Sequence, residues 1–229
     1  MDLLRRDWNR YDTLGRTYYL AESPECAYSE VLAQFKRANG ASDPLEPVAR
    51  VLNLTLEETV RMIAQDWGEE DFHNVGALPP TWRSERRLYE ARLVGGGWLV
   101  DVQHPDSIAA LEEADDGRVA QFLANNGIPS LTVSTLTSEN RTVTTMLAET
   151  IRDDQLDDGW TPRGVHFGSK HGGAWCKAVW LPYAAASPSG IEITKSTHIE
   201  ANDSAFRTVL RRFRLCVLRG RHALGEGGS

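Results

Sequence analysis

The sequence predicts an α+β fold. Segments typical of strands and segments typical of helices are mixed along the 229 residues without a regular alternation, a pattern that favours a sheet with helices packed beside it. Hydrophobic residues make up 41% of the chain and charged residues 25%, which suits a globular domain with a real core. We therefore expect a single domain over residues 1–220, with a helical insertion at about residues 41–75 and a flexible tail at residues 221–229.

The first expected elements are a strand and the helix that follows it. The segment Thr17–Ala21 has the aromatic and aliphatic content of a half-buried strand. Ser23 is the expected N-cap of a helix over residues 25–37, with Pro24 at its first position. Apolar residues of this helix recur at a spacing that places them on one face, namely Ala27, Val31, Leu32 and Phe35.

The expected insertion consists of two helices after a turn-rich break at residues 39–47. Residues 48–52 suggest a short helix, and a longer helix is expected at residues 56–67, where Thr55 and Glu58 have the form of a capping box. Such a pair can be mistaken for a DNA-binding helix-turn-helix. The acidic residues 66–71 at its end argue against that interpretation.

The middle of the chain is expected to form a hairpin. Residues 88–94 and 98–102 have strand character, and Gly95, Gly96 and Gly97 lie between them. Three glycines are also found in phosphate loops, but no helix with Lys-Ser/Thr follows them here. We therefore interpret the glycines as the turn of a hairpin.

The remaining elements complete the mixture of strands and helices. Ser107 is the expected cap of a helix that runs to about residue 114, and residues 131–133 suggest a short strand. A helix over residues 142–152 is predicted by an apolar face. Strands are expected at residues 164–169, 178–181 and 191–193, and the segment at residues 211–221 is basic.

Charge and cysteine content exclude several classes of function. The net charge of −7 disfavours broad nucleic-acid binding, although a few arginines can still hold a small anion. Cys26, Cys176 and Cys216 show neither a disulfide framework nor a CxxC pattern, and His166, His171 and Cys176 fit no common zinc spacing. We expect no metal. Residues 1–7 lead into no apolar signal core, and no run is long enough to span a bilayer, so we expect a cytoplasmic protein.

Two blocks of residues together resemble the RES domain, named for its Arg, Glu and Ser. The resemblance covers roughly residues 5–185, with Trp98-Leu99-Val100-Asp101-Val102 in a typical position between the blocks. It departs from the family at His166, where Tyr is more usual, and over residues 39–80. The residues of the two blocks are Arg10-Tyr11, Tyr19-Leu20-Ala21-Glu22-Ser23, Ala27 and Glu30, then Gly159-Trp160 and Gly164-Val165-His166-Phe167-Gly168-Ser169.

The resemblance implies a fold and an activity. RES proteins look like ADP-ribosyltransferases, with a split, mostly antiparallel sheet flanked by helices. Known members cleave the nicotinamide–ribose bond of NAD, some with inorganic phosphate as co-substrate, and act as toxins beside an Xre-like antitoxin. By resemblance this chain consumes NAD as a substrate by phosphorolysis or hydrolysis, and it could form a homo-oligomer. Two alternatives remain open, an ADP-ribosyltransferase that modifies a macromolecule and a catalytically silent RES-like binding module.

The resemblance assigns Glu30 and Ser169 to the reacting end of NAD. Cleavage leaves an oxocarbenium-like sugar, and a carboxylate near that centre stabilises the developing charge or grips the ribose hydroxyls. Ser169 is expected to orient Glu30 or a ribose hydroxyl, and it lacks the surroundings of a hydrolase nucleophile. Glu30 and Ser169 are therefore expected to face one pocket.

Arg10, Tyr19 and Tyr11 are the expected binding residues. A guanidinium can hold the two phosphates of NAD bidentately, which makes Arg10 the candidate, with Arg16 as its substitute. Tyr19 could stack on the nicotinamide or on a ribose. For Tyr11, packing is as good an interpretation as ligand contact.

Overall fold

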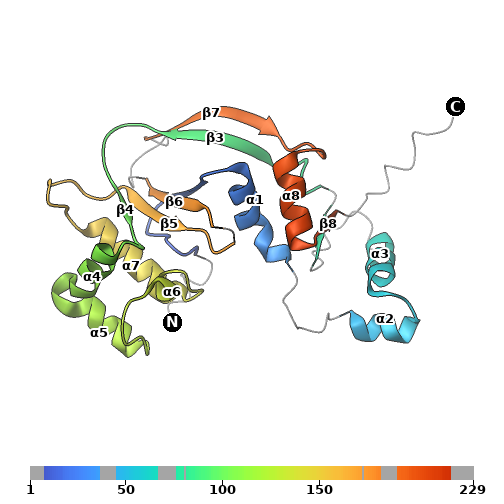
Figure 1. The fold of residues 1–229 in the computed structure, drawn as a ribbon, viewed down its shortest axis with the longest axis horizontal. Helices are drawn as coiled ribbons and strands as arrows, with labels where there is room; N and C mark the ends of the chain where they lie inside the picture. Colours follow the sequence, from blue (N-terminus) through green and yellow to red (C-terminus); the bar gives the residue numbers. More distant parts are fainter. Residues whose placement is uncertain are drawn as a thin grey trace. The chain divides into compact units, whose positions relative to one another are not determined.

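The computed structural model describes residues 8–36, 45–66, 76–79, 81–171, 173–181 and 190–217. It confirms the α+β class (Figure 1). The chain divides into two compact units, with residues 1–27 and 90–195 in unit 1 and residues 28–89 and 196–229 in unit 2. In the described part of the chain, no helix is long and apolar enough to cross a membrane.

A four-stranded sheet forms the centre of unit 1. Its strands lie in the order β1-β6-β5-β4, with antiparallel pairing of β1 to β6 and of β6 to β5, and parallel pairing of β5 to β4. The predicted strands at residues 17–21, 164–169 and 178–181 are confirmed, the last beginning three residues earlier. The strand bounds are Thr17–Ala21 for β1, Leu99–Asp101 for β4, Gly164–Gly168 for β5 and Trp175–Trp180 for β6.

Helices cover one face of this sheet. Val165 and Phe167 lie on the same face of β5 and point into a core that includes residues of the four α-helices in the middle of the chain. The predicted helix at residues 142–152 is confirmed as α7, whose Val143, Leu147 and Ile151 are buried. The four α-helices are α4 (Pro105–Glu113), α5 (Arg118–Asn125), α6 (Val133–Leu136) and α7 (Arg141–Asp153), and the 3₁₀-helix η3 (Asp115–Gly117) lies between α4 and α5 in the chain.

Two buried cysteines meet inside this helical core. The Sγ atoms of Cys26, in the first turn of the helix after β1, and of Cys176, on β6, are 3.5 Å apart. Both are buried, and the structure records no disulfide bond between them. The sequence spacing of the cysteines gave no indication of this proximity.

The other face of the sheet packs against strands from a second, two-stranded sheet. β3 (Arg87–Leu93) pairs with β7 (Ile191–His198). Residues Ala91, Leu93 and Ile191 of these strands pack with Val179 and Leu181. The strand predicted at residues 191–193 is therefore confirmed, and it extends to His198.

The predicted hairpin at residues 88–102 is wrong. β3 pairs with β7, and β4 pairs with β5, so the strands on either side of the glycines belong to different sheets. The side chain of Arg163 occupies the loop instead. Its Nη1 donates to the carbonyl oxygens of Val94, Gly95 and Gly96 at 3.0, 3.3 and 2.9 Å, and its Nη2 donates to that of Gly190 at 3.2 Å.

Two other expectations are overturned by helix caps. Residues 131–133 form no strand, because Thr132 caps α6 and its Oγ1 accepts a hydrogen bond from the amide of Thr135 at 3.2 Å. Ser107 lies inside α4 and is not its cap. His104 caps that helix, accepting from the amide of Asp106, and Pro105 occupies its first turn.

The first long helix begins as predicted and ends earlier. α1 (Pro24–Leu32) is followed by the 3₁₀-helix η2 (Ala33–Phe35), and the Ser23 hydroxyl accepts from the amide of Cys26 at 3.2 Å. Val31 was expected on the apolar face but is 46% exposed, while Tyr28 is buried instead. The predicted end of the helix at residue 37 lies outside the described residues.

Unit 2 has its own core. Leu32 and Phe35 pack there with Trp82 and with Phe206 and Val209 of α8 (Ser204–Phe213), a helix that was not predicted. β2 (Ala77–Leu78) pairs in parallel with β8 (Cys216–Val217).

The two helices of the predicted insertion are present in unit 2 as α2 (Glu46–Leu52) and α3 (Leu56–Asp66). The capping box is confirmed, because the amide of Glu58 donates to the Thr55 hydroxyl at 3.2 Å and the amide of Thr55 donates to the Glu58 carboxylate at 2.8 Å. The acidic residues 67–71 and the expected tail at residues 221–229 lie outside the described part of the chain. The single domain over residues 1–220 stays a prediction.

Candidate anion-binding site

The site begins on the face of the central sheet that the helices cover. Tyr19 of β1 and Phe167 of β5 point to this face, and their ring centroids are 6.5 Å apart. Tyr11 is fully buried and lies 4.7 Å from the Phe167 ring, and its hydroxyl donates to the carbonyl of Leu136 at 3.0 Å. In this conformation Tyr11 contributes packing rather than a surface for a ligand.

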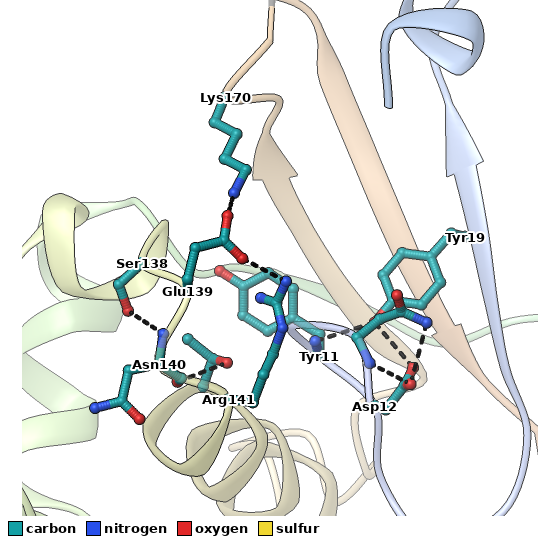
Figure 2. Close-up of polar contacts among 10 residues, drawn as sticks. Tyr11, Asp12, Tyr19, Ser138, Glu139, Asn140, Arg141 and Lys170 are labelled. Atoms are coloured by element: carbon teal, nitrogen blue, oxygen red, sulfur yellow. Dashed lines mark hydrogen bonds and ion pairs between the residues drawn. The ribbon is translucent and has the colours of Figure 1, made fainter. Parts of the chain in front are cut away.

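The hydroxyl of Tyr19 links two parts of the loop before β1. It accepts a hydrogen bond from the amide of Tyr11 at 3.0 Å and donates to the carboxylate of Asp12 at 2.9 Å (Figure 2). Burial, followed by the negative charge of Asp12, raises the pKa of Tyr19 well above its usual range. The phenol therefore stays protonated and remains a hydrogen-bond donor at neutral pH.

Arg10 places a buried guanidinium beside these tyrosines. Arg10 is 7% exposed, and its guanidinium carbon lies 5.9 Å from the centroid of the Phe167 ring. The Nε atom is buried and has no hydrogen-bond partner among the described residues. A buried donor without an acceptor costs free energy, and a charged one costs more.

Arg141 brings a second guanidinium to the same place. It is the first residue of α7, directly after the N-cap Asn140, and its Nη1 is also buried without a partner in the described part of the structure. Burial, followed by the positive charge of Arg10, lowers the pKa of Arg141. The two cations are therefore close enough to repel each other, at a helix end that is itself positive.

Glu139 and Lys170 lie at the outer side of this pair. One carboxylate oxygen of Glu139 is 2.6 Å from Nη2 of Arg141, and the other forms an ion pair with Nζ of Lys170 (Figure 2). Three cations, Arg10, Arg141 and Lys170, thus gather near two carboxylates, those of Glu139 and Asp12. Donors without acceptors, an excess of positive charge and a helix N-terminus together favour a bound anion.

The other predicted residues fall in different places. Ser169 lies in the turn after β5, next to Lys170 in the chain, and its hydroxyl accepts from the amide of His171 at 3.0 Å. Arg16 is exposed, so the buried Arg10 is the better candidate of the two. Glu30 is half-buried on the part of α1 that belongs to unit 2. Its expected meeting with Ser169 stays a prediction.

His166, where the sequence departs from the RES pattern, does not face the site. It lies between Val165 and Phe167 on β5, and its ring stacks on that of Trp175 with centroids 4.4 Å apart. Because side chains alternate along a strand, His166 points to the opposite face of the sheet from Phe167. Among the described residues, no group of three His, Cys, Asp or Glu side chains could hold a metal ion.

Sequence reasoning missed Arg141 and Lys170. One indication of Arg141 was available, because a cation in the first turn of a helix opposes the helix dipole and this turn holds no acidic residue to offset it. Lys170 directly follows the last residue of the second RES-like block, and nothing in its spacing pointed to a partner around residue 139.

No protein-family model, no curated protein and no solved structure matches the chain.

Proposed function

We propose that this protein is an enzyme that cleaves the nicotinamide–ribose bond of NAD and that its fold is ADP-ribosyltransferase-like. The transfer acceptor is phosphate or water. In this proposal NAD is the substrate, and the cell uses the activity as a toxin restrained by an Xre-like antitoxin. The RES-like blocks of the sequence support the reaction, and the arginine pair supports the ligand.

The observation that carries the proposal is the pair of guanidiniums, Arg10 and Arg141, with buried N–H groups that have no acceptor among the described residues. NAD carries a pyrophosphate between its two nucleosides, and paired guanidiniums hold phosphate oxygens through charge-assisted hydrogen bonds. A bound pyrophosphate would satisfy the donors and remove the repulsion that lowers the pKa of Arg141.

The proposal also assigns roles to Tyr19, Glu30 and Ser169. Tyr19 is partly exposed, and we assign its ring to stacking on a flat ring of the ligand, while its hydroxyl stays fixed by Tyr11 and Asp12. We assign Glu30 to the developing positive charge at the ribose. We assign Ser169 to the positioning of a ribose hydroxyl.

The first experiment is to incubate the pure protein with NAD, with and without inorganic phosphate, and to identify the products by mass spectrometry. Release of nicotinamide with ADP-ribose indicates hydrolysis. Release of nicotinamide with a phosphorylated ADP-ribose, only when phosphate is present, indicates phosphorolysis. If NAD is never consumed with either acceptor or with an added macromolecule, the enzyme proposal fails and a binding module replaces it.

A matched pair of variants tests the phosphate contact. Arg118 is also the first residue of a helix, α5, but it is an exposed partner of Asp115. We expect Arg141→Gln to weaken NAD binding by roughly 10–100-fold, the worth of one charge-assisted hydrogen bond. Arg118→Gln should bind NAD like the wild type. Equal binding by both variants would remove Arg141 from the site.

A further inference from the structure

The contact between Glu139, Arg141 and Lys170 has the form of an anion already bound to the site. Both oxygens of the Glu139 carboxylate are used, one by Nη2 of Arg141 at 2.6 Å and the other by Nζ of Lys170 (Figure 2). A carboxylate and a phosphate present similar pairs of oxygens to such donors. Glu139 therefore makes the contacts that a ligand phosphate would need from these two cations.

Burial differs sharply between the carboxylate and its partners. The side chains of Arg141 and Lys170 are only 25% and 27% exposed, whereas that of Glu139 is 65% exposed. Arg141 is further fixed because it begins α7 directly after the N-cap. Glu139 precedes that cap, in a bend outside any helix or strand. The cations are thus the fixed part of the contact, and the glutamate side chain can rotate into solvent at little cost.

We propose that Glu139 is an internal competitor that occupies the phosphate site of the free protein and is displaced when the ligand binds. The inference rests on the proposed function only in taking the Arg10–Arg141 pair as the place where phosphate binds. Glu139 offsets part of the positive charge of Arg141 and Lys170 while the site is empty, and it lowers the affinity for any anion too weakly charged to displace it. It therefore acts as a specificity residue that favours a pyrophosphate over a monoanion.

The size of the effect follows from population arithmetic. A ligand binds only the fraction of molecules in which the site is open, so its apparent affinity falls by that fraction. With a partly exposed carboxylate and two cationic partners, molecules in which Glu139 occupies the site should outnumber those in which the site is open by roughly 5–10 to 1. Removal of its charge should tighten pyrophosphate binding by about the same factor.

The test uses Glu139→Gln and inorganic pyrophosphate, with the dissociation constant measured by isothermal titration calorimetry. The matched control is Glu192→Gln, because Glu192 forms an exposed ion pair with Arg92 at the same distance of 2.6 Å and its loss changes the net charge equally. We expect Glu139→Gln to bind pyrophosphate about 5–10-fold more tightly than the wild type, and Glu192→Gln to bind it like the wild type. A second substitution, Arg141→Gln, should abolish the gain.

The outcomes separate this inference from the proposed function. If pyrophosphate binds to the wild type and to Glu139→Gln equally well, or less well to the variant, the competitor role is overturned and the anion site stands. If pyrophosphate binds to neither protein, both the competitor role and the phosphate contact are overturned. If the gain appears but NAD is not consumed, the competitor role is supported and the proposed reaction alone fails.

Discussion

At the scale of single residues, Arg10 and Arg141 are unfavourable neighbours in a protein without ligand. Each loses hydration on burial, and each has an N–H group without an acceptor among the described residues. The positive charge of Arg10 also lowers the pKa of Arg141. Such arrangements persist mainly where they serve a function, because a simple Arg-to-apolar change would relieve the cost.

Glu30 can be tested separately from the arginines. Glu30→Gln keeps the size and the hydrogen-bonding reach of the side chain but removes its charge, so we expect kcat to fall by about 10²–10³ with little change in NAD binding. Arg10→Ala should instead raise the dissociation constant for NAD, because a phosphate contact already acts in the ground state. Steady-state kinetics and NAD titrations measure the two effects.

The control for Glu30 lies on the same helix. Glu25→Gln removes an exposed carboxylate from the first turn of α1 and should leave turnover unchanged. A folded Glu30→Gln protein that consumes NAD as fast as the wild type would exclude Glu30 from the mechanism.

The two cysteines of the unit 1 core make a prediction about oxidation. With Sγ atoms 3.5 Å apart, Cys26 and Cys176 should form a disulfide when a thiol oxidant such as diamide accepts two hydrogens from them. The bond would close a long loop and should stabilise the protein by about 2–4 kcal/mol. Mass spectrometry of the alkylated protein detects the link, and Cys176→Ala should abolish it. Full alkylation of both thiols after diamide treatment would contradict the prediction.

At the scale of elements, the loop that joins β3 to β4 depends on the fit of Arg163. A Cβ atom added to Gly97, whose φ is +118°, would lie 2.4 Å from Cδ of Arg163, and the guanidinium of Arg163 is held by four carbonyl groups. Gly97→Ala should therefore lower the free energy of unfolding by roughly 1–3 kcal/mol. Urea unfolding measures the loss.

Gly96 is the matched control in the same loop, because a Cβ there would meet nothing within 4 Å. Gly96→Ala should change the free energy of unfolding by less than about 0.5 kcal/mol. Equal losses in the two variants would show that Arg163 does not hold this loop.

The same loop shows what a sequence can and cannot predict about elements. Thr17–Ala21 and the apolar face of α7 were predictable because their periodicity lies within one segment. The partner strand of β3 was not predictable, because the alternation of apolar and polar residues identifies a strand but does not say which strand pairs with it. The strand predicted around Thr132 was wrong for another reason. A β-branched residue is common in strands, but its hydroxyl can also cap a helix, as it does here.

The candidate site was likewise predictable only where its residues belong to one local pattern. Arg10 and Tyr19 were found through the RES-like pattern, which links residues near the start of the chain. Arg141 was missed because its importance arises only when α7 is brought beside Arg10. Lys170 was missed because its ion pair with Glu139 joins segments that are far apart in the sequence.

At the scale of the whole molecule, the buried tyrosines predict how stability depends on pH. Burial and the carboxylate of Asp203 raise the pKa of Tyr28 to about 12, while an unfolded tyrosine has a pKa of about 10. Above pH 10 the unfolded chain loses a proton that the native protein keeps, so the stability present below pH 10 is progressively lost up to about pH 12. Tyr28→Phe should reduce this loss.

Urea unfolding on either side of pH 10 measures the effect. Tyr11 and Tyr19, whose pKa values burial also raises, should leave part of the alkaline loss in the variant. An identical pH dependence for wild type and Tyr28→Phe would contradict the assignment to Tyr28.

The organisation of the molecule was only partly predictable. Apolar patterns showed which faces of the elements are buried, but not that Leu32 and Phe35 join one core while Cys26, earlier on the same helix, joins another. The helix α8 was not predicted either, although Phe206, Val209 and Phe213 form its buried face, because the basic residues of its last turn dominate the composition there.

The pairing of β1 with β6 has a consequence for folding during synthesis on the ribosome. Thr17 leaves the ribosome before its partner Trp180, which lies 163 residues further along the chain, has been made. At 5–20 residues per second, the interval is about 10–30 s. During that time Tyr18, Tyr19 and Leu20 have no sheet to join, and the strand edge remains open to chaperones or to other chains. The central sheet can therefore assemble only after β6 has been translated, and a ribosome that stalls before residue 175 would release a chain in which β1 lacks its partner strand.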